Sequence, residues 1–113
     1  MSVDLQHPEQ TSALFKAAAE AILSDPLREG SVVRLPSTGH LTISGDLHDQ
    51  VIHLDKIRGM ADLASGKDRH LILQELIHGP RLTHGCDLSY RMLAKAAQDI
   101  LSFPGQVHVM LGN

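Results

Sequence analysis

The chain has 113 residues, of which 42% are apolar, and its formal net charge is −3 when its eight histidines are counted as neutral. This acidic balance argues against a nucleic-acid-binding surface, which would need a basic stripe. Cys86 is the only cysteine, so the chain can form neither an intrachain disulfide nor a zinc cluster of cysteines.

The first half of the chain reads as a helix followed by two strands. Pro8 and Glu9 suit the first turn of a helix, and apolar residues at helical spacing continue it until Pro26. Residues 31–35 and 40–44 are apolar enough for strands, and the Pro-Ser-Thr-Gly run at residues 36–39 has the chemistry of a turn. We therefore expect a hairpin over residues 31–44.

The second half alternates helices with strands. A helical face runs from Val51 to Ala64, and a short continuous apolar run at residues 70–73 indicates a strand covered on both faces. Asp87 is a good N-cap for a helix over about residues 88–101. Residues 106–111 form the last predicted strand.

This order predicts an α/β fold, with a mainly parallel sheet, an N-terminal hairpin and flanking helices. Residues 1–113 are expected to form one domain, in which residues 1–30 are a helical N-terminal extension. No signal peptide is evident at the start, and no apolar run reaches the roughly 18 residues of a membrane span. We expect a cytoplasmic protein that binds neither membrane nor nucleic acid.

Polar side chains follow each of the three predicted parallel strands. The strand ends read Gly45-Asp46-Leu47-His48, Gln74-Glu75 and Gly112-Asn113. Ligands bind beyond the carboxyl ends of strands in open α/β sheets. Asp46 and His48 are two residues apart, so in an extended backbone they point the same way and can reach one cation. Each residue alone is weak evidence, because an aspartate there is usually a cap and a histidine is usually solvated.

The strand ends resemble the calcineurin-like metallophosphoesterases, which include the phosphoprotein phosphatases. Gly45-Asp46-Leu47-His48 is similar to the family motif Gly-Asp-x-His-Gly, although Asp49 replaces its last glycine. Gly112-Asn113 matches the start of the family motif Gly-Asn-His-Glu. The middle motif departs, since Gln74-Glu75 stands where the family has Gly-Asp. The resemblance covers about Leu41 to Asn113.

This resemblance implies a phosphoester hydrolase with two divalent metal ions, in the N-terminal half of an αββα sandwich. Asp46 and His48 would bind the first ion, Glu75 would bridge, and Asn113 would bind the second. Two such ions polarise a phosphate ester and activate water. Oxygen and nitrogen ligands suit Mn, Fe or Zn, with Mg also possible. The substrate would be a phosphorylated protein or small molecule.

Two further residues have alternative interpretations. Arg81 is a candidate phosphate contact, because a guanidinium group pairs bidentately with phosphate oxygens, or it is a solvated loop residue. His78 stands at a later acidic position of the middle motif, where it either supports the metal ligands or is a structural loop residue.

The resemblance also implies a histidine after Asn113 that would act in catalysis, and the sequence ends before it. We therefore expect an N-terminal fragment of an enzyme, or a reduced relative in which a second copy covers the open sheet edge. Two alternatives stay open: a non-catalytic α/β interaction module that keeps part of the metal site, and an unrelated histidine-rich metal-binding protein.

Overall fold

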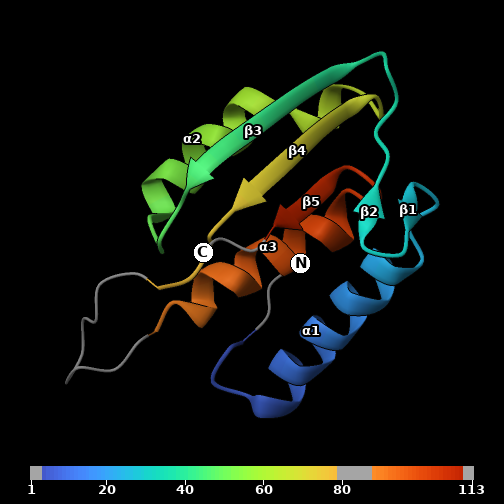
Figure 1. The fold of residues 1–113 in the computed structure, drawn as a ribbon. Coiled ribbons are helices and arrows are strands. Elements are labelled where there is room, and N and C mark those ends of the chain that lie inside the picture. The colour runs from blue at the N-terminus through green and yellow to red at the C-terminus, as the bar shows by residue number, and fades with distance from the viewer. Residues whose placement is uncertain (1–3, 79–87, 111–113) are drawn as a thin grey trace.

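The computed structural model describes residues 4–78 and 88–110, and Figure 1 shows their arrangement. Helices and strands alternate through most of this part of the chain. In chain order the elements are α1 (Pro8–Leu23), β1 (Arg28–Glu29), β2 (Val32–Val33), β3 (His40–Asp46), α2 (Val51–Ala61), the short 3-10 helix η1 (Leu63–Ser65), β4 (Arg69–Gln74), α3 (Tyr90–Ser102) and β5 (Val107–Met110).

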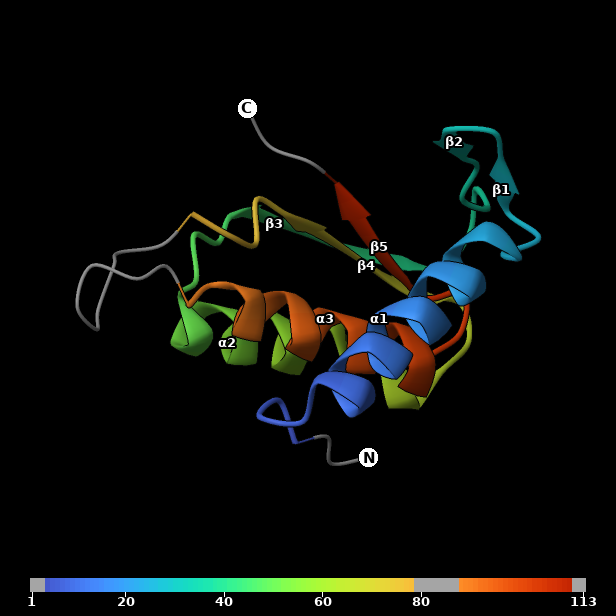
Figure 2. The ribbon, with the colours of Figure 1, turned by 90° about the horizontal axis from the view of Figure 1, so that it is seen from below.

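The central feature is a three-stranded sheet in the order β3-β4-β5, and both pairs of neighbouring strands are parallel. The helices α2 and α3 connect these strands, so the predicted α/β fold with a parallel sheet is confirmed. Figure 2 shows α1, α2 and α3 on one face of this sheet. We call the opposite face, which carries Ile43, Ile72 and His108, the outer face of the sheet.

The core lies between the sheet and the helices. Leu71 and Leu73 of β4 point to this side and are fully buried, as are Leu54 of α2 and Met92 of α3. Each such side chain stabilises the fold by roughly 1.5–3 kcal/mol relative to an exposed position. Helix α1 packs against α3, so the N-terminal helix belongs to the same helical layer.

The predicted hairpin over residues 31–44 is wrong. Strand β3 pairs in parallel with β4, while β2 pairs with β1 through a two-residue loop in which Gly30 has φ +64°. Gly39 lets the start of β3 lie against the residue before β4. Its φ is +115°, and a Cβ there would lie 2.3 Å from the carbonyl oxygen of Asp68. His40 donates to that same oxygen at 3.0 Å, which aligns the start of β3 with β4.

Two helix boundaries also differ from prediction. Helix α2 ends at Ala61 because Asp62 adopts a left-handed conformation (φ +46°), and a separate turn of 3-10 helix follows. Helix α3 begins at Tyr90, about two residues later than predicted, and the proposed N-cap Asp87 lies outside the described residues. In the described ranges, no helix is long and apolar enough to cross a membrane.

A buried glutamine joins the start of β5 to the turn before β4. Gln106 is 7% exposed, and its Nε2 lies within 2.9–3.0 Å of three carbonyl oxygens, those of Leu63, Gly66 and Arg69. The backbone carbonyl of Gln106 accepts from the backbone N–H of Leu71 at 2.8 Å. This residue therefore fixes the connection on which the alignment of β4 and β5 depends.

Replacing Gln106 with leucine is expected to lower the free energy of unfolding by about 2 kcal/mol, because buried carbonyls lose their donor while the volume is kept. Urea denaturation followed by circular dichroism measures this loss. Gln98→Leu, on a half-buried position of α3, is the control and should change stability by less than about 0.5 kcal/mol. Equal effects of the two substitutions would contradict the role assigned to Gln106.

Candidate functional site

A β-bulge at the end of β3 determines where Asp46 points. Ile43 pairs with Ile72, but Asp46 pairs with Gln74, so β3 uses one residue more than β4 over this stretch. The hydroxyl of Ser44 accepts from the backbone N–H of Gln74 at 3.0 Å in place of a regular ladder bond. Thr42 and Ser44 are buried, whereas the bulge brings Asp46 into the row of Gln74 on the outer face.

Asp46 and His48 form a solvent-accessible pair just beyond this bulge. Oδ2 of Asp46 lies 3.7 Å from Nε2 of His48, and each side chain is 49% exposed. Between them Leu47 is 3% exposed and anchors the loop in the core. A Cβ added at Gly45 would meet nothing within 4 Å, so there is open space next to the pair.

The loop that carries this pair is fastened to the end of β4 by backbone hydrogen bonds. The carbonyl oxygen of Glu75 accepts from the N–H of Leu47 at 3.1 Å and from that of His48 at 2.8 Å. The N–H of Asp49 donates to the carbonyl of Leu76 at 2.9 Å. The ends of β3 and β4 therefore hold one another in place.

Backbone strain gathers at this edge of the sheet. In the described ranges, five non-glycine residues have positive φ, and four of them lie here: His48 (+43°), Asp49 (+61°), Glu75 (+42°) and His78 (+65°). Such conformations cost on the order of 1 kcal/mol each and are found preferentially at functional sites, where the surrounding structure enforces them.

The side chain of Glu75 belongs to a second, separate pair. Glu75 is 7% exposed, and its Oε1 lies 3.9 Å from Nε2 of His78, which is largely exposed. Within residues 4–78 and 88–110, no three side chains of the types that bind metals come together as one group. The structure thus brings Asp46 next to His48 and ties Glu75 to them through its backbone. Asn113 and Arg81 lie outside the described residues.

A buried group of histidines on the outer face was not singled out from the sequence. His70 of β4 and His108 of β5 stack with ring centroids 5.4 Å apart, and Nδ1 of His70 lies 3.2 Å from Nε2 of His108. Nδ1 of His108 faces Oδ2 of Asp25 at 4.0 Å, and both these side chains are about nine-tenths buried. A histidine inside each of two apolar strands was the signal that could have found this group.

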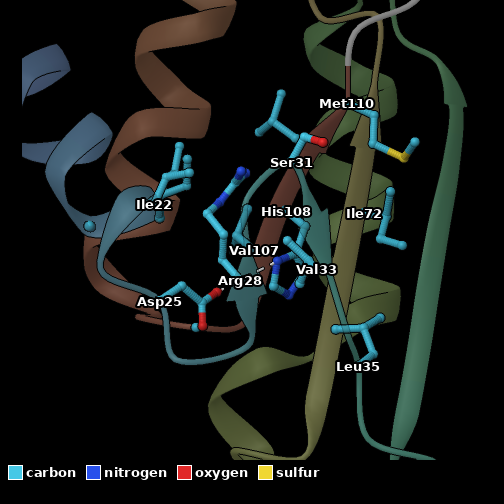
Figure 3. Close-up of a pocket in the computed structure, with 14 residues that line it drawn as sticks. Ile22, Asp25, Arg28, Ser31, Val33, Leu35, Ile72, Val107, His108 and Met110 are labelled. Atoms are coloured by element: carbon cyan, nitrogen blue, oxygen red, sulfur yellow. Dashed lines mark ion pairs between the residues drawn. The ribbon is translucent and has the colours of Figure 1, made fainter.

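Asp25 and His108 line a pocket of about 250 Å³ beneath the β1–β2 hairpin, shown in Figure 3. Its walls come from α1, the hairpin and the outer face of the sheet, and they are mainly aliphatic, as at Ile22, Val33 and Ile72. The pocket and the Asp46–His48 pair are separate features of the molecule.

The buried His108 predicts a dependence of stability on pH. Burial lowers the pKa of His108, and His70 and Arg28 add to this lowering while Asp25 opposes it. Because the folded-state pKa lies below the unfolded one, neutral His108 contributes stability that is fully present above pH 6.5 and is lost as the pH falls through the folded-state pKa. His108→Gln removes this titration. Urea denaturation between pH 7.5 and 5 should therefore show a smaller loss of stability in the variant than in the original chain, and equal losses would contradict the prediction.

Comparison of the chain with known protein families, with curated proteins and with solved structures finds no match. The geometry of the site and its resemblance in sequence are therefore the basis for assigning a function.

Proposed function

We propose that this chain is part of a metal-dependent phosphoester hydrolase whose site lies at the carboxyl edge of β3 and β4. The observation that carries the proposal is the accessible Asp46–His48 pair, 3.7 Å apart, on a loop where the backbone is strained. Non-glycine residues held in left-handed conformations cluster at active sites and ligand clamps, which supports a functional role for this loop. The αββα sandwich, in which this sheet would be one half, is part of the same proposal.

The donor set fits a divalent cation. A carboxylate oxygen and an imidazole nitrogen that already lie close together suit Mn, Fe or Zn, and Mg through its oxygen ligands. Asp46 and His48 would hold the first ion, and Glu75 and Asn113 would complete a two-metal site. Bound there, the two ions would supply Lewis acidity toward a phosphate ester and toward water.

The protein's own residues would position the metal-binding side chains and would not themselves react with the phosphate ester. The Ser44 bulge turns Asp46 to the outer face, and the two N–H groups that bind the Glu75 carbonyl hold His48 beside it. Glu75 is well buried next to His78, so its carboxylate would have to turn toward the Asp46–His48 pair to bridge two ions. The phosphate ester as the substrate rests on the motif resemblance of Gly45-Asp46-Leu47-His48 and Gly112-Asn113.

The test is hydrolysis of p-nitrophenyl phosphate and bis(p-nitrophenyl) phosphate by the purified chain. We expect turnover with added Mn²⁺, its loss with excess EDTA, and its return when Mn²⁺ is restored. Calorimetric titration with Mn²⁺ is run in parallel. Binding without turnover would favour the interaction module that keeps part of the metal site. The absence of both binding and turnover would overturn the proposal.

A further inference from the structure

The pocket beneath the hairpin contains an arginine, Arg28, for which the described residues provide no ion-pair partner. Nη1 of Arg28 donates to the carbonyl of Gly30 at 2.8 Å, which fixes the guanidinium group. Its Nε is buried, and among the described residues nothing accepts a hydrogen bond from it. No carboxylate of the described part of the chain forms an ion pair with Arg28, in contrast to Arg34, which pairs with Glu29 at 3.0 Å.

The free part of the guanidinium group has a defined shape. With Nη1 engaged on Gly30 and Nε buried, Nη2 is the nitrogen left to donate to a ligand, and a charged N–H donor pairs strongly with a carboxylate oxygen. A buried N–H without an acceptor costs about 1–3 kcal/mol. Because Nε is closed to solvent, a ligand oxygen in the pocket would meet the guanidinium group at Nη2, and the ion pair formed there would be the gain on binding.

Two other polar groups of the pocket, Asp25 and His108, are already engaged. Asp25 accepts from the backbone N–H of Leu27 at 2.9 Å through Oδ1 and faces His108 through Oδ2. His108 uses its second nitrogen on His70. Figure 3 shows the guanidinium group of Arg28 on the side of Ile22 and Ser31, with the Asp25 carboxylate at the other end beside His108. The ligand end of the pocket is therefore positive.

We propose that this pocket binds a small monocarboxylate, with its carboxylate on Nη2 of Arg28 and its apolar body against Ile22, Val33 and Ile72. The volume of about 250 Å³ lies just below the roughly 300 Å³ at which pockets for drug-sized ligands begin. A short aliphatic acid or a single-ring aromatic acid fits this limit. The aliphatic walls provide the burial, and Arg28 provides the selection for charge.

Titration of the metal-free chain with hexanoate and with benzoate tests the proposal, because EDTA separates it from the proposed metal site. Methyl NMR shifts of Val33, Ile72 and Met110 report binding. Hexanol and benzamide share the apolar bodies without the charge and are expected to bind at least tenfold more weakly. Arg28→Met should weaken carboxylate binding at least tenfold, whereas Arg34→Met, the control that also removes one arginine, should not change it.

The variants keep the test independent of folding. Arg28→Met removes a buried unpaired donor, so its melting temperature should equal or exceed that of the original chain. Arg28→Lys keeps the charge and should retain more of the carboxylate affinity than Arg28→Met. Equal binding of hexanol and hexanoate would overturn the proposal, as would displacement of benzoate by inorganic phosphate at equal concentration, or no binding of either acid.

Discussion

Replacing Asp46 with asparagine is expected to reduce Mn²⁺-dependent phosphoester hydrolysis by about 100-fold or more, equivalent to about 2.7 kcal/mol of transition-state stabilisation. The substitution keeps the shape of the side chain but removes the anionic oxygen that a divalent cation requires. Since Asp46 is half-exposed and sits beyond the bulge, the fold should be unaffected, with a change in unfolding free energy within about 0.5 kcal/mol.

Asp4 offers a closely matched control. Its Oδ2 lies 3.3 Å from Nε2 of His7, and both side chains are more than half exposed, so it is a second accessible Asp–His pair in the same chain. It lies before α1, away from the carboxyl edge of the sheet. Asp4→Asn makes the same change in charge and should leave hydrolysis unchanged.

The measurement is the initial rate of bis(p-nitrophenyl) phosphate hydrolysis at several Mn²⁺ concentrations for the original chain and both variants. Loss of rate in Asp46→Asn that extra Mn²⁺ partly restores would indicate weakened metal binding. Full activity of Asp46→Asn, or an equal loss in Asp4→Asn, would contradict the assignment of Asp46 to the site.

Local patterns in the sequence were sufficient for most of the secondary structure. The helix after Pro8 and the apolar runs of β4 and β5 have periodicities that depend on near neighbours only. Pairing between strands is a non-local property, and there the prediction failed. The turn residues 36–39 suggested a hairpin, whereas the close approach of Gly39 to Asp68, 29 positions later, aligns β3 with β4 instead.

For the candidate site, the sequence predicted which residues lie together but not the backbone geometry that brings them together. Asp46 and His48 were expected to converge because residues two apart in an extended strand point the same way. They do lie together, but His48 has φ +43° and a bulge precedes Asp46, so the convergence comes from a left-handed loop. The bulge depends on how Ser44 meets Gln74 of another strand, which no local pattern reveals.

The histidine group was missed for a related reason. Each of His70 and His108 alone reads as a surface residue, and only the parallel register of β4 and β5 stacks them. Asp25, Arg28 and the outer face of the sheet meet only after α1 and the hairpin have packed. Non-local assembly therefore decides both the pocket and the part of the candidate site that the sequence did not predict.

A partly buried ion pair between α2 and α3, in which Asp99 is the buried partner, should carry a large share of the stability. Nη2 of Arg58 donates to Oδ1 of Asp99 at 2.5 Å, and the Asp99 side chain is 5% exposed. Burial raises the pKa of Asp99, while the hydrogen bond and charge of Arg58 oppose the rise. Its other oxygen, Oδ2, is buried, and among the described residues no group donates to it. Arg58 is therefore the main group that stabilises the buried carboxylate.

Arg58→Met is expected to lower the free energy of unfolding at pH 7 by about 3 kcal/mol, because it leaves an uncompensated buried charge. The folded-state pKa of Asp99 is raised, so its contribution to stability is present below pH 3.8 and is lost as the pH rises through the folded-state pKa. The defect should therefore be smaller at pH 4.5 than at pH 7, which urea denaturation at the two pH values measures.

Two further variants separate the buried charge from the loss of an arginine as such. Arg34→Met breaks the pair with Glu29, in which both side chains are 76% exposed, and should cost less than about 0.5 kcal/mol. The double variant Arg58→Met with Asp99→Leu removes both charges, and it should recover most of the lost stability because an apolar pair of similar volume can replace a buried ion pair. If Arg58→Met were no more harmful than Arg34→Met, or if the double variant were the least stable, Asp99 would not be the buried charge that Arg58 compensates.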